Sequence, residues 1–118
     1  MAWTTYRDLI VWQKAMDLVD ESYHLLRLLP KEELFSLSDQ MRRAAISIPS
    51  NIAEGHGRQS EKEFHHYLSI AKGSVYELDT QIQICLRQGY FPPEDAGSAL
   101  SLCAEVGKLL TTLLKTKN

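Results

Sequence analysis

The sequence contains little of what identifies several protein classes. It has only two cysteines, Cys85 and Cys103, which are too few for a disulfide framework. Its 13 basic and 15 acidic residues give a net charge of −2, so no global charge favours nucleic acid or an anionic membrane. Residues 1–8 lack the apolar run of a signal peptide, and no run approaches the roughly 18 apolar residues of a membrane span. We therefore expect a cytoplasmic protein with no membrane partner.

The alternation of polar and apolar residues that marks β-strands is also absent. Apolar residues instead recur every three or four positions in four successive segments, which is the spacing of one helix face. The apolar fraction of 44% and the length of 118 residues suit one globular domain with one core. The sequence therefore predicts an all-α fold over residues 1–118, an antiparallel up-down-up-down four-helix bundle.

Capping and breaking residues divide the chain into the four predicted helices. A hydroxyl with an acid three residues later caps a helix start, and proline or glycine ends a helix. Thr5 with Asp8 is therefore expected to start the first helix, and a glycine in the left-handed conformation to end the second. Residues 31–35 predict a short helical turn between these two helices. The residues at the start and end of the four predicted helices, in chain order, are Thr5 and Pro30, Ser36 and Gly55–Gly57, Ser60 and Gly89, and Pro93 and Lys117.

The first predicted helix carries two adjacent apolar stripes. One steps by three and four from Leu9 to Leu26, and the other runs beside it. Together they have the width of a core-facing helix, so we expect both to face the core. The first stripe consists of Leu9, Trp12, Met16, Val19, Tyr23 and Leu26, and the second of Val11, Ala15, Leu18, Leu25 and Leu29.

The second predicted helix contains an internal proline beside a polar stripe. Pro49 removes a backbone donor and crowds the carbonyl of Ala45, so we expect a kink there. Small polar and charged residues recur on one face past this proline, and a matching set lies on the third helix. The candidate interface or binding residues are Gln40, Arg43, Ser47, Ser50, Asn51, Glu54, Arg58, Glu63, Ser74 and Glu77.

This polar stripe has several interpretations. It lines a subunit interface, a ligand groove or a nucleic-acid surface, or it serves the bundle itself. In the last case Ser47 and Ser50 donate to carbonyls freed by Pro49. Glu54 then pairs with Arg58 one turn later, in a partly buried network. The expected ion pairs across the bundle join Arg43 or Arg58 to Glu63 or Glu77.

No set of residues specifies a reaction. His65 and His66 are adjacent, so their side chains point about 100° apart on a helix and do not chelate one ion. Cys85 and Cys103 occupy core stripes, where thiols behave as small hydrophobes. No serine stands in a nucleophile-elbow context. We expect no catalytic residue, no cofactor and no metal, and therefore a protein that is not an enzyme.

Several segments carry a resemblance to a known family. They are Leu9–Ala15 near the start, Gln40–Ala45 and Ser47–Gly55 in the second helix, and Ile70–Ser74 with Glu77–Leu78 in the third. In order and spacing the chain resembles the bacterial four-helix-bundle proteins of the 23S rRNA intervening-sequence family, once labelled as an S23 ribosomal protein. The resemblance implies an antiparallel bundle that assembles as a homopentamer. Apolar residues outside the core stripes, such as Trp3, Ile70, Tyr76 and Leu102, also favour a cyclic homo-oligomer.

The resemblance implies little about activity. Some family members are encoded within insertions in rRNA genes. A similar bundle is the accessory protein of diversity-generating retroelements, where a basic pentamer engages nucleic acid and a reverse transcriptase. This chain differs in being slightly acidic. Our leading hypothesis is a non-enzymatic oligomeric interaction or scaffold protein, and the alternative is an RNA- or DNA-associated accessory protein that uses the basic and polar surface of the second helix.

Overall fold

The computed structural model of the protein describes residues 5–115. This part of the chain contains four α-helices and two short 3₁₀ turns, and no strand, which confirms the predicted all-α fold. The elements are η1 (Tyr6–Asp8), α1 (Ile10–Leu26), η2 (Lys31–Glu33), α2 (Leu37–His56), α3 (Glu61–Arg87) and α4 (Pro93–Lys115). Trp3 and Lys117, named above, lie outside the described residues.

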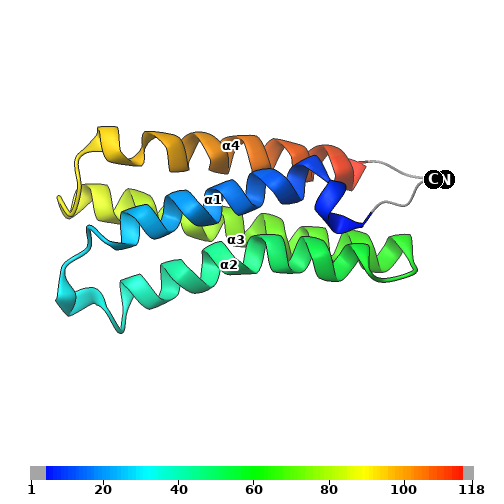
Figure 1. Ribbon diagram of the computed structural model, residues 1–118, viewed down its shortest axis with the longest axis horizontal. Coiled ribbons are helices and arrows are strands. Elements are labelled where there is room, and N and C mark those ends of the chain that lie inside the picture. Colours follow the sequence, from blue (N-terminus) through cyan, green and yellow to red (C-terminus); the bar gives the residue numbers. More distant parts are fainter. Residues whose placement is uncertain (1–4, 116–118) are drawn as a thin grey trace.

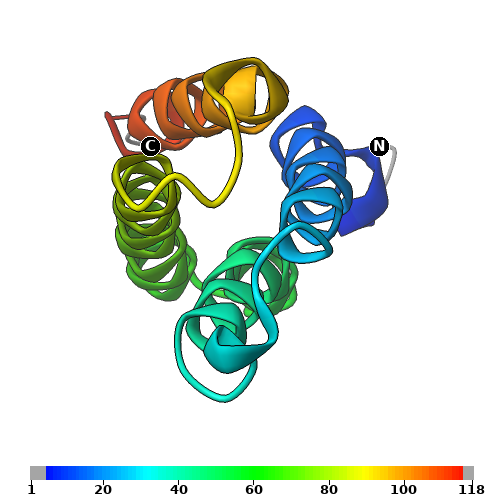
Figure 2. The same ribbon diagram turned by 90° about the vertical axis from the view of Figure 1, so that its left-hand side faces the viewer.

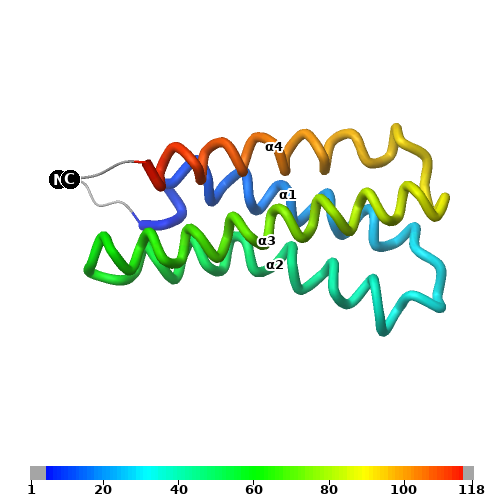
Figure 3. The backbone as a smooth tube through the Cα atoms, turned by 180° about the vertical axis from the view of Figure 1, so that it is seen from behind, coloured from blue at the N-terminus to red at the C-terminus, as the bar shows by residue number. Residues whose placement is uncertain are grey.

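Consecutive helices run in opposite directions along an elongated bundle of 48 × 25 × 21 Å (Figure 1). Seen end-on, the helices surround a common core in the order α1, α2, α3, α4, and α4 returns to α1 (Figure 2). The α1–α2 and α3–α4 connections share one end of the bundle, and the α2–α3 connection lies at the other (Figure 3). Each helix therefore packs against two neighbours and keeps an outer side.

The capping signal at Thr5 belongs to η1 and not to α1. The Thr5 hydroxyl accepts a hydrogen bond from the Arg7 amide at 3.1 Å, and the Asp8 carboxylate accepts one from the Thr5 amide at 3.3 Å. Helix α1 begins at Ile10, after Leu9, whose side chain makes no capping hydrogen bond. The predicted helix start is therefore a 3₁₀ turn, because the same side chains satisfy free amides in any tight helical turn.

The buried face of α1 is the second of the two predicted stripes. The stripe from Leu9 to Leu26 flanks that face, and its member Met16 is 39% exposed. The core face also contains Ser22, whose hydroxyl donates to the carbonyl of Leu18 at 2.7 Å and so needs no other partner. The buried residues of α1 are Val11, Ala15, Leu18, Ser22 and Leu25.

The other boundaries follow their predicted signals, with one exception. The Ser60 hydroxyl accepts a hydrogen bond from the Glu63 amide at 3.2 Å at the start of α3, and Pro93 is the first residue of α4. Helix α2 ends at His56, but its capping Gly57 has a φ of −74°, so the left-handed ending predicted there is wrong. Among the described residues only Gly89, after α3, has a positive φ, of 74°, a conformation that favours glycine.

Helix α2 continues without interruption from Leu37 to His56 through the buried Pro49. The kink at Pro49 stays a prediction. The apolar series that steps by three and four along α2, α3 and α4 is buried, except for Leu37, Phe64 and Leu113, which are partly buried against the core. The helical period therefore identifies the inner face of these three helices correctly.

Helix α4 is long and apolar enough to cross a membrane, by length and composition alone. This corrects the expectation that no segment approaches a membrane span. One such helix is weak support for a span, because the core helix of a globular bundle passes the same test. Five residues of α4, Ala96, Ala99, Cys103, Val106 and Leu110, are buried in the bundle core. Yet only 22% of its most apolar window is buried within the chain.

Candidate functional site

Part of the polar stripe predicted from the sequence lies along the contact between α2 and α3. At its centre the hydroxyls of Ser47 and Ser74 are 2.8 Å apart. The Asn51 side-chain amide donates both to the Ser47 carbonyl at 2.8 Å and to the Ser47 hydroxyl at 2.9 Å. Ser47 therefore bonds across to α3, and the expectation that its hydroxyl donates to a carbonyl freed by Pro49 is wrong. These three small side chains join the two helices.

Towards the α2–α3 turn the two helix backbones come close together at Gly55. A Cβ atom built on Gly55 would lie 2.6 Å from the Tyr67 Cβ, closer than real Cβ atoms approach, and 3.3 Å from the Phe64 carbonyl oxygen. Only a residue without a Cβ fits this contact. The glycine predicted as a helix-ending residue therefore has a packing function, and it sets the distance at which the polar side chains beside it meet.

Arg58 closes this end of the stripe. Its guanidinium donates to the Glu54 carboxylate at 2.9 Å and to the Tyr67 hydroxyl at 2.9 Å, and it lies 3.6 Å from the Glu63 carboxylate. The guanidinium also sits 5.2 Å from the centre of the Tyr67 ring. The electrostatic interaction with Tyr67 and then the hydrogen bond to Glu54 raise the pKa of Arg58. The predicted pairs Glu54–Arg58 and Arg58–Glu63 are both confirmed.

The network around Arg58 is at the surface and not partly buried, as the sequence interpretation assumed. The side chains of Arg58, Glu54 and Glu63 are 42%, 53% and 52% exposed. Water and salt screen charges that are this accessible. The cluster therefore orients the α2–α3 turn, and loss of one carboxylate leaves no buried unpaired charge.

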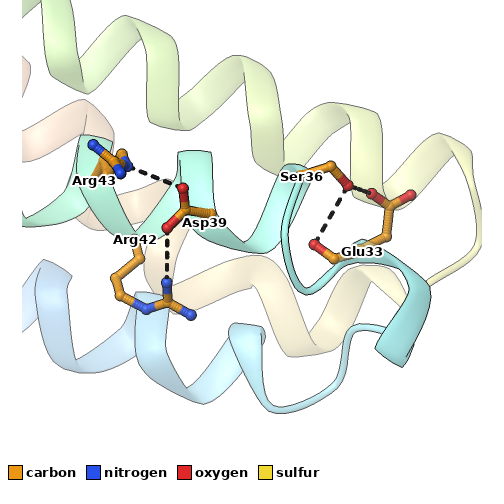
Figure 4. A network of polar contacts seen from close by, with 5 residues as sticks. All are labelled: Glu33, Ser36, Asp39, Arg42 and Arg43. Atoms are coloured by element: carbon orange, nitrogen blue, oxygen red, sulfur yellow. Dashed lines mark hydrogen bonds and ion pairs between the residues drawn. The ribbon is translucent and has the colours of Figure 1, made fainter.

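Arg43 does not pair with Glu63 or Glu77, which corrects the sequence expectation. Its Nε donates to the Asp39 carboxylate at 3.0 Å, and Arg42 donates to the other oxygen of Asp39 at 3.2 Å (Figure 4). The Arg43 side chain is 78% exposed. Sequence analysis missed Asp39, although its spacing of three and four residues from the two arginines is the usual signal for a helical ion pair.

The remaining stripe residues do not join these clusters. The Glu77 carboxylate accepts a hydrogen bond from the Gln81 amide at 3.3 Å. The other polar atom of this buried glutamine, Oε1, has no hydrogen-bond partner among residues 5–115. Gln40 and Ser50 are exposed, and within the described chain neither side chain makes a hydrogen bond. The ten candidate residues therefore form separate small clusters and no single binding site.

A second polar contact, which the sequence did not predict, fastens the opposite end of the bundle. The Tyr90 hydroxyl, after α3, donates to the Glu33 carboxylate in η2 at 2.7 Å. The Ser36 hydroxyl donates to the second oxygen of Glu33 at 2.7 Å. The hydrogen bonds from Tyr90 and then Ser36 lower the pKa of Glu33, and the bond to Glu33 raises the pKa of Tyr90 to about 12. This contact joins the α1–α2 and α3–α4 connections.

The two thiols are buried and free of disulfides, as predicted. Burial, the larger effect, raises the pKa of Cys103 to about 12 and that of Cys85 to about 11. The Cys85 thiol lies 3.6 Å from the Met41 sulfur. Within residues 5–115 no group of three or more His, Cys, Asp or Glu side chains is placed to hold a metal ion. Neither thiol has the accessible, low-pKa character of a nucleophile.

The arrangement of the stripe suits helix–helix attachment more than ligand binding. Each charged cluster contains both signs: Arg42 and Arg43 share Asp39, and Arg58 is shared between two glutamates. The three arginines and three acids of the two clusters sum to zero formal charge. The polar face of α2 therefore offers no excess of positive charge to a phosphate backbone.

Two comparisons with known proteins give a match. Residues 7–112 match the model of the 23S rRNA-intervening sequence protein family. A crystal structure from Bacteroides thetaiotaomicron is similar over 91% of this chain and 100% of the other chain, with a TM-score of 0.83 and 28% sequence identity. That structure is described as a protein with unknown function from the S23 ribosomal protein family. No curated protein matches the chain.

Proposed function

The chain belongs to the 23S rRNA-intervening sequence protein family, and we propose that it acts as a non-enzymatic scaffold, a homo-oligomeric ring of five helical bundles that presents its surface to another macromolecule. The observation that carries this proposal is the amount of apolar surface left outside the bundle core. A monomeric four-helix bundle needs one buried stripe per helix, and several helices of this chain carry more.

Large apolar side chains are exposed on three of the four helices and on the α1–α2 connection. The most exposed is Phe35, at 91%, next to Leu34 at 48%. Ile10 and Ile46 are 58% and 42% exposed, and Tyr76 is 61% exposed. Isolated exposed apolar residues are normal on protein surfaces, but a set this large on a small domain is typical of a protein that buries more surface on association.

The polar stripe supports a scaffold role because most of its side chains have partners within the chain. The Ser47–Ser74–Asn51 cluster and the Arg58 cluster both fasten α2 to α3. The family resemblance is the basis for five subunits. The buried thiols offer no reactive group, and the histidines of the described chain are not gathered into a site.

The alternative function, RNA or DNA association through helix α2, receives no support from its charges. The arginines on and just after α2, which are Arg42, Arg43 and Arg58, all have carboxylate partners. A nucleic-acid surface on this helix would need those carboxylates to move away. We therefore keep the scaffold as the proposed function, and nucleic-acid binding becomes an outcome of its test.

Light scattering after size-exclusion chromatography tests the proposal. We expect a mass near five times 13.4 kDa at micromolar concentration. A mass of 13.4 kDa over the micromolar range would refute the oligomeric scaffold. A second measurement uses fluorescence anisotropy with a labelled generic RNA at low and high salt. Salt-dependent binding, lost when Arg42 and Arg43 are both changed to glutamine, would favour the nucleic-acid function instead.

A further inference from the structure

Helix α4 separates two surface grooves of opposite charge. One groove, of about 420 Å³, lies between α3 and α4, and the other, of about 520 Å³, lies between α1 and α4. The end-on view shows α4 between α3 and α1 (Figure 2), so the residues that line the two grooves place them on adjacent sides of the bundle. Neither groove includes a residue of the polar stripe described above.

The α3–α4 groove is basic and carries an exposed aromatic ring. Tyr76, 61% exposed, lines it together with Lys108 and Lys115. The Lys72 ammonium lies 5.9 Å from the centre of the Tyr76 ring. No carboxylate of residues 5–115 forms an ion pair with these three lysines, although Asp79 also lines the groove. Lys108, Lys115 and Asp79 give the lining of the groove a formal charge of +1, and Lys72 beside the Tyr76 ring raises the local charge to +2.

The α1–α4 groove is acidic, and three of the four residues on its α4 side are small. Asp17, Asp20 and Glu21 of α1 form its acidic side, which gives a formal charge of −3. None of these acids has a basic partner within salt-bridge distance in the described chain. The α4 side is lined by Gly97, Ser98, Ser101 and Leu102. Small side chains leave room for a ring from a partner, and the acids face outward without neutralisation.

We propose that the occupant of the acidic groove is a second copy of this chain, which inserts the Tyr76 face with its lysines. This inference rests on the proposed homo-oligomeric function and names the two surfaces that assemble. The charges of the two grooves are complementary, so each contact brings Lys72 and Lys108 of one subunit towards Asp17 and Asp20 of the next. Both sets are unpaired in the single chain, and the contact neutralises both at once.

A contact between two different surfaces of the same chain is heterologous. It closes into a ring when the rotation that relates neighbouring copies returns to the first copy after a whole number of steps. In a closed ring each subunit contacts two neighbours, and the directions to these neighbours differ by the interior angle of a regular polygon, about 90° for four copies and about 108° for five. Adjacent sides of a four-helix bundle point about 90° apart. The two grooves lie on adjacent sides but at different heights, because residues 103–115 of α4 line one and residues 97–102 line the other. Closure at a small number of subunits, five included, therefore requires each bundle to tilt relative to the ring axis.

Charge reversal tests the contact. The first variant, Lys72→Glu with Lys108→Glu, makes both grooves acidic, and the second, Asp17→Lys with Asp20→Lys, makes both basic. We expect each to shift the light-scattering mass towards the 13.4 kDa monomer. The chain that combines all four substitutions restores opposite charges and should regain the wild-type mass. Lys62→Glu, which reverses an exposed lysine of α3 outside both grooves, is the matched control and should keep the wild-type mass.

The outcomes separate this inference from the proposed function. If the wild type is an oligomer and both reversal variants keep its mass, the groove contact is wrong while the scaffold proposal stands. If the wild type is a monomer, the scaffold proposal itself fails. Variants that keep the wild-type circular dichroism but remain monomeric after all four substitutions also overturn the contact. A third result would also overturn the contact: RNA binding that depends on salt and is lost in the Lys72→Glu, Lys108→Glu variant without a change in mass. The basic groove would then bind nucleic acid.

Discussion

Replacement of glycine by alanine should have opposite effects at two helical positions of this bundle. At Gly55 an added Cβ would lie 2.6 Å from the Tyr67 Cβ and 3.2 Å from the Phe64 ring. The Tyr67 Cβ is bonded directly to the backbone of α3, so a change of rotamer does not relieve the contact, and α3 must move away from α2. At Gly73, in the middle of α3, an added Cβ meets nothing within 4 Å.

The magnitudes follow from two opposing effects. Alanine is favoured over glycine inside a helix by about 0.5–1 kcal/mol. Forcing an extra methyl into a closely packed contact costs about 1–3 kcal/mol. At Gly73 only the first effect acts, so Gly73→Ala should stabilise the fold by about 0.5–1 kcal/mol. At Gly55 the steric cost is the larger, and we expect Gly55→Ala to lower the free energy of unfolding by about 1–2 kcal/mol.

Urea unfolding followed by circular dichroism measures both effects. All proteins are compared at one concentration, because association makes apparent stability depend on protein concentration. The two alanine variants should then lie on opposite sides of the wild type. A Gly55→Ala protein as stable as the wild type would show that α2 and α3 are not held at this distance by Gly55.

Three further predictions concern single residues. Pro49→Ala should keep the far-UV circular dichroism of the wild type, because α2 is helical on both sides of this residue, and a large loss of helicity would contradict this. Tyr90→Phe should be less stable than the wild type above about pH 4.5, as measured by urea unfolding at several pH values. The difference should vanish as the pH falls through the lowered pKa of Glu33. It should also vanish as the pH rises through about 12, where Tyr90 ionises. Cys85 and Cys103 should resist alkylation at about pH 8 in the native protein and react in urea, as measured by mass spectrometry, because burial raises both pKa values.

The sequence predicts the helices of this chain well because their ends carry local chemical signals. Ser60 caps α3 and Pro93 opens α4, and each acts through contacts within one turn. The same signals do not reveal the type of turn that they cap. Thr5 with Asp8 caps a 3₁₀ turn, and the chain needs one further extended residue, Leu9, before α1 begins.

The polar contacts were predictable where they span one or two helical turns and not where they span the fold. Glu54–Arg58 follows from spacing, and the missed Asp39–Arg43 pair has the same spacing. The Tyr90–Glu33 hydrogen bond joins residues 57 positions apart, in two connections that meet only because the bundle is antiparallel. No local pattern contains that information. The stripe also appeared as one face in the sequence, whereas contact with α3 divides it into separate clusters.

The two apolar stripes of α1 explain why sequence periodicity and burial differ, and they connect the fold to the proposed assembly. Both stripes have helical spacing, but one bundle core has room for the stripe that contains Leu18 and leaves Met16 of the other partly exposed. Periodicity measures the apolar surface that a helix offers, and it does not tell which partner buries that surface. If a second copy buries part of it, apolar burial supplies the affinity, while complementary charges such as Lys108 and Asp20 select the face that docks. Charge reversal should therefore prevent the two grooves from docking and lower the light-scattering mass, and removal of the exposed Tyr76 ring should weaken the same contact.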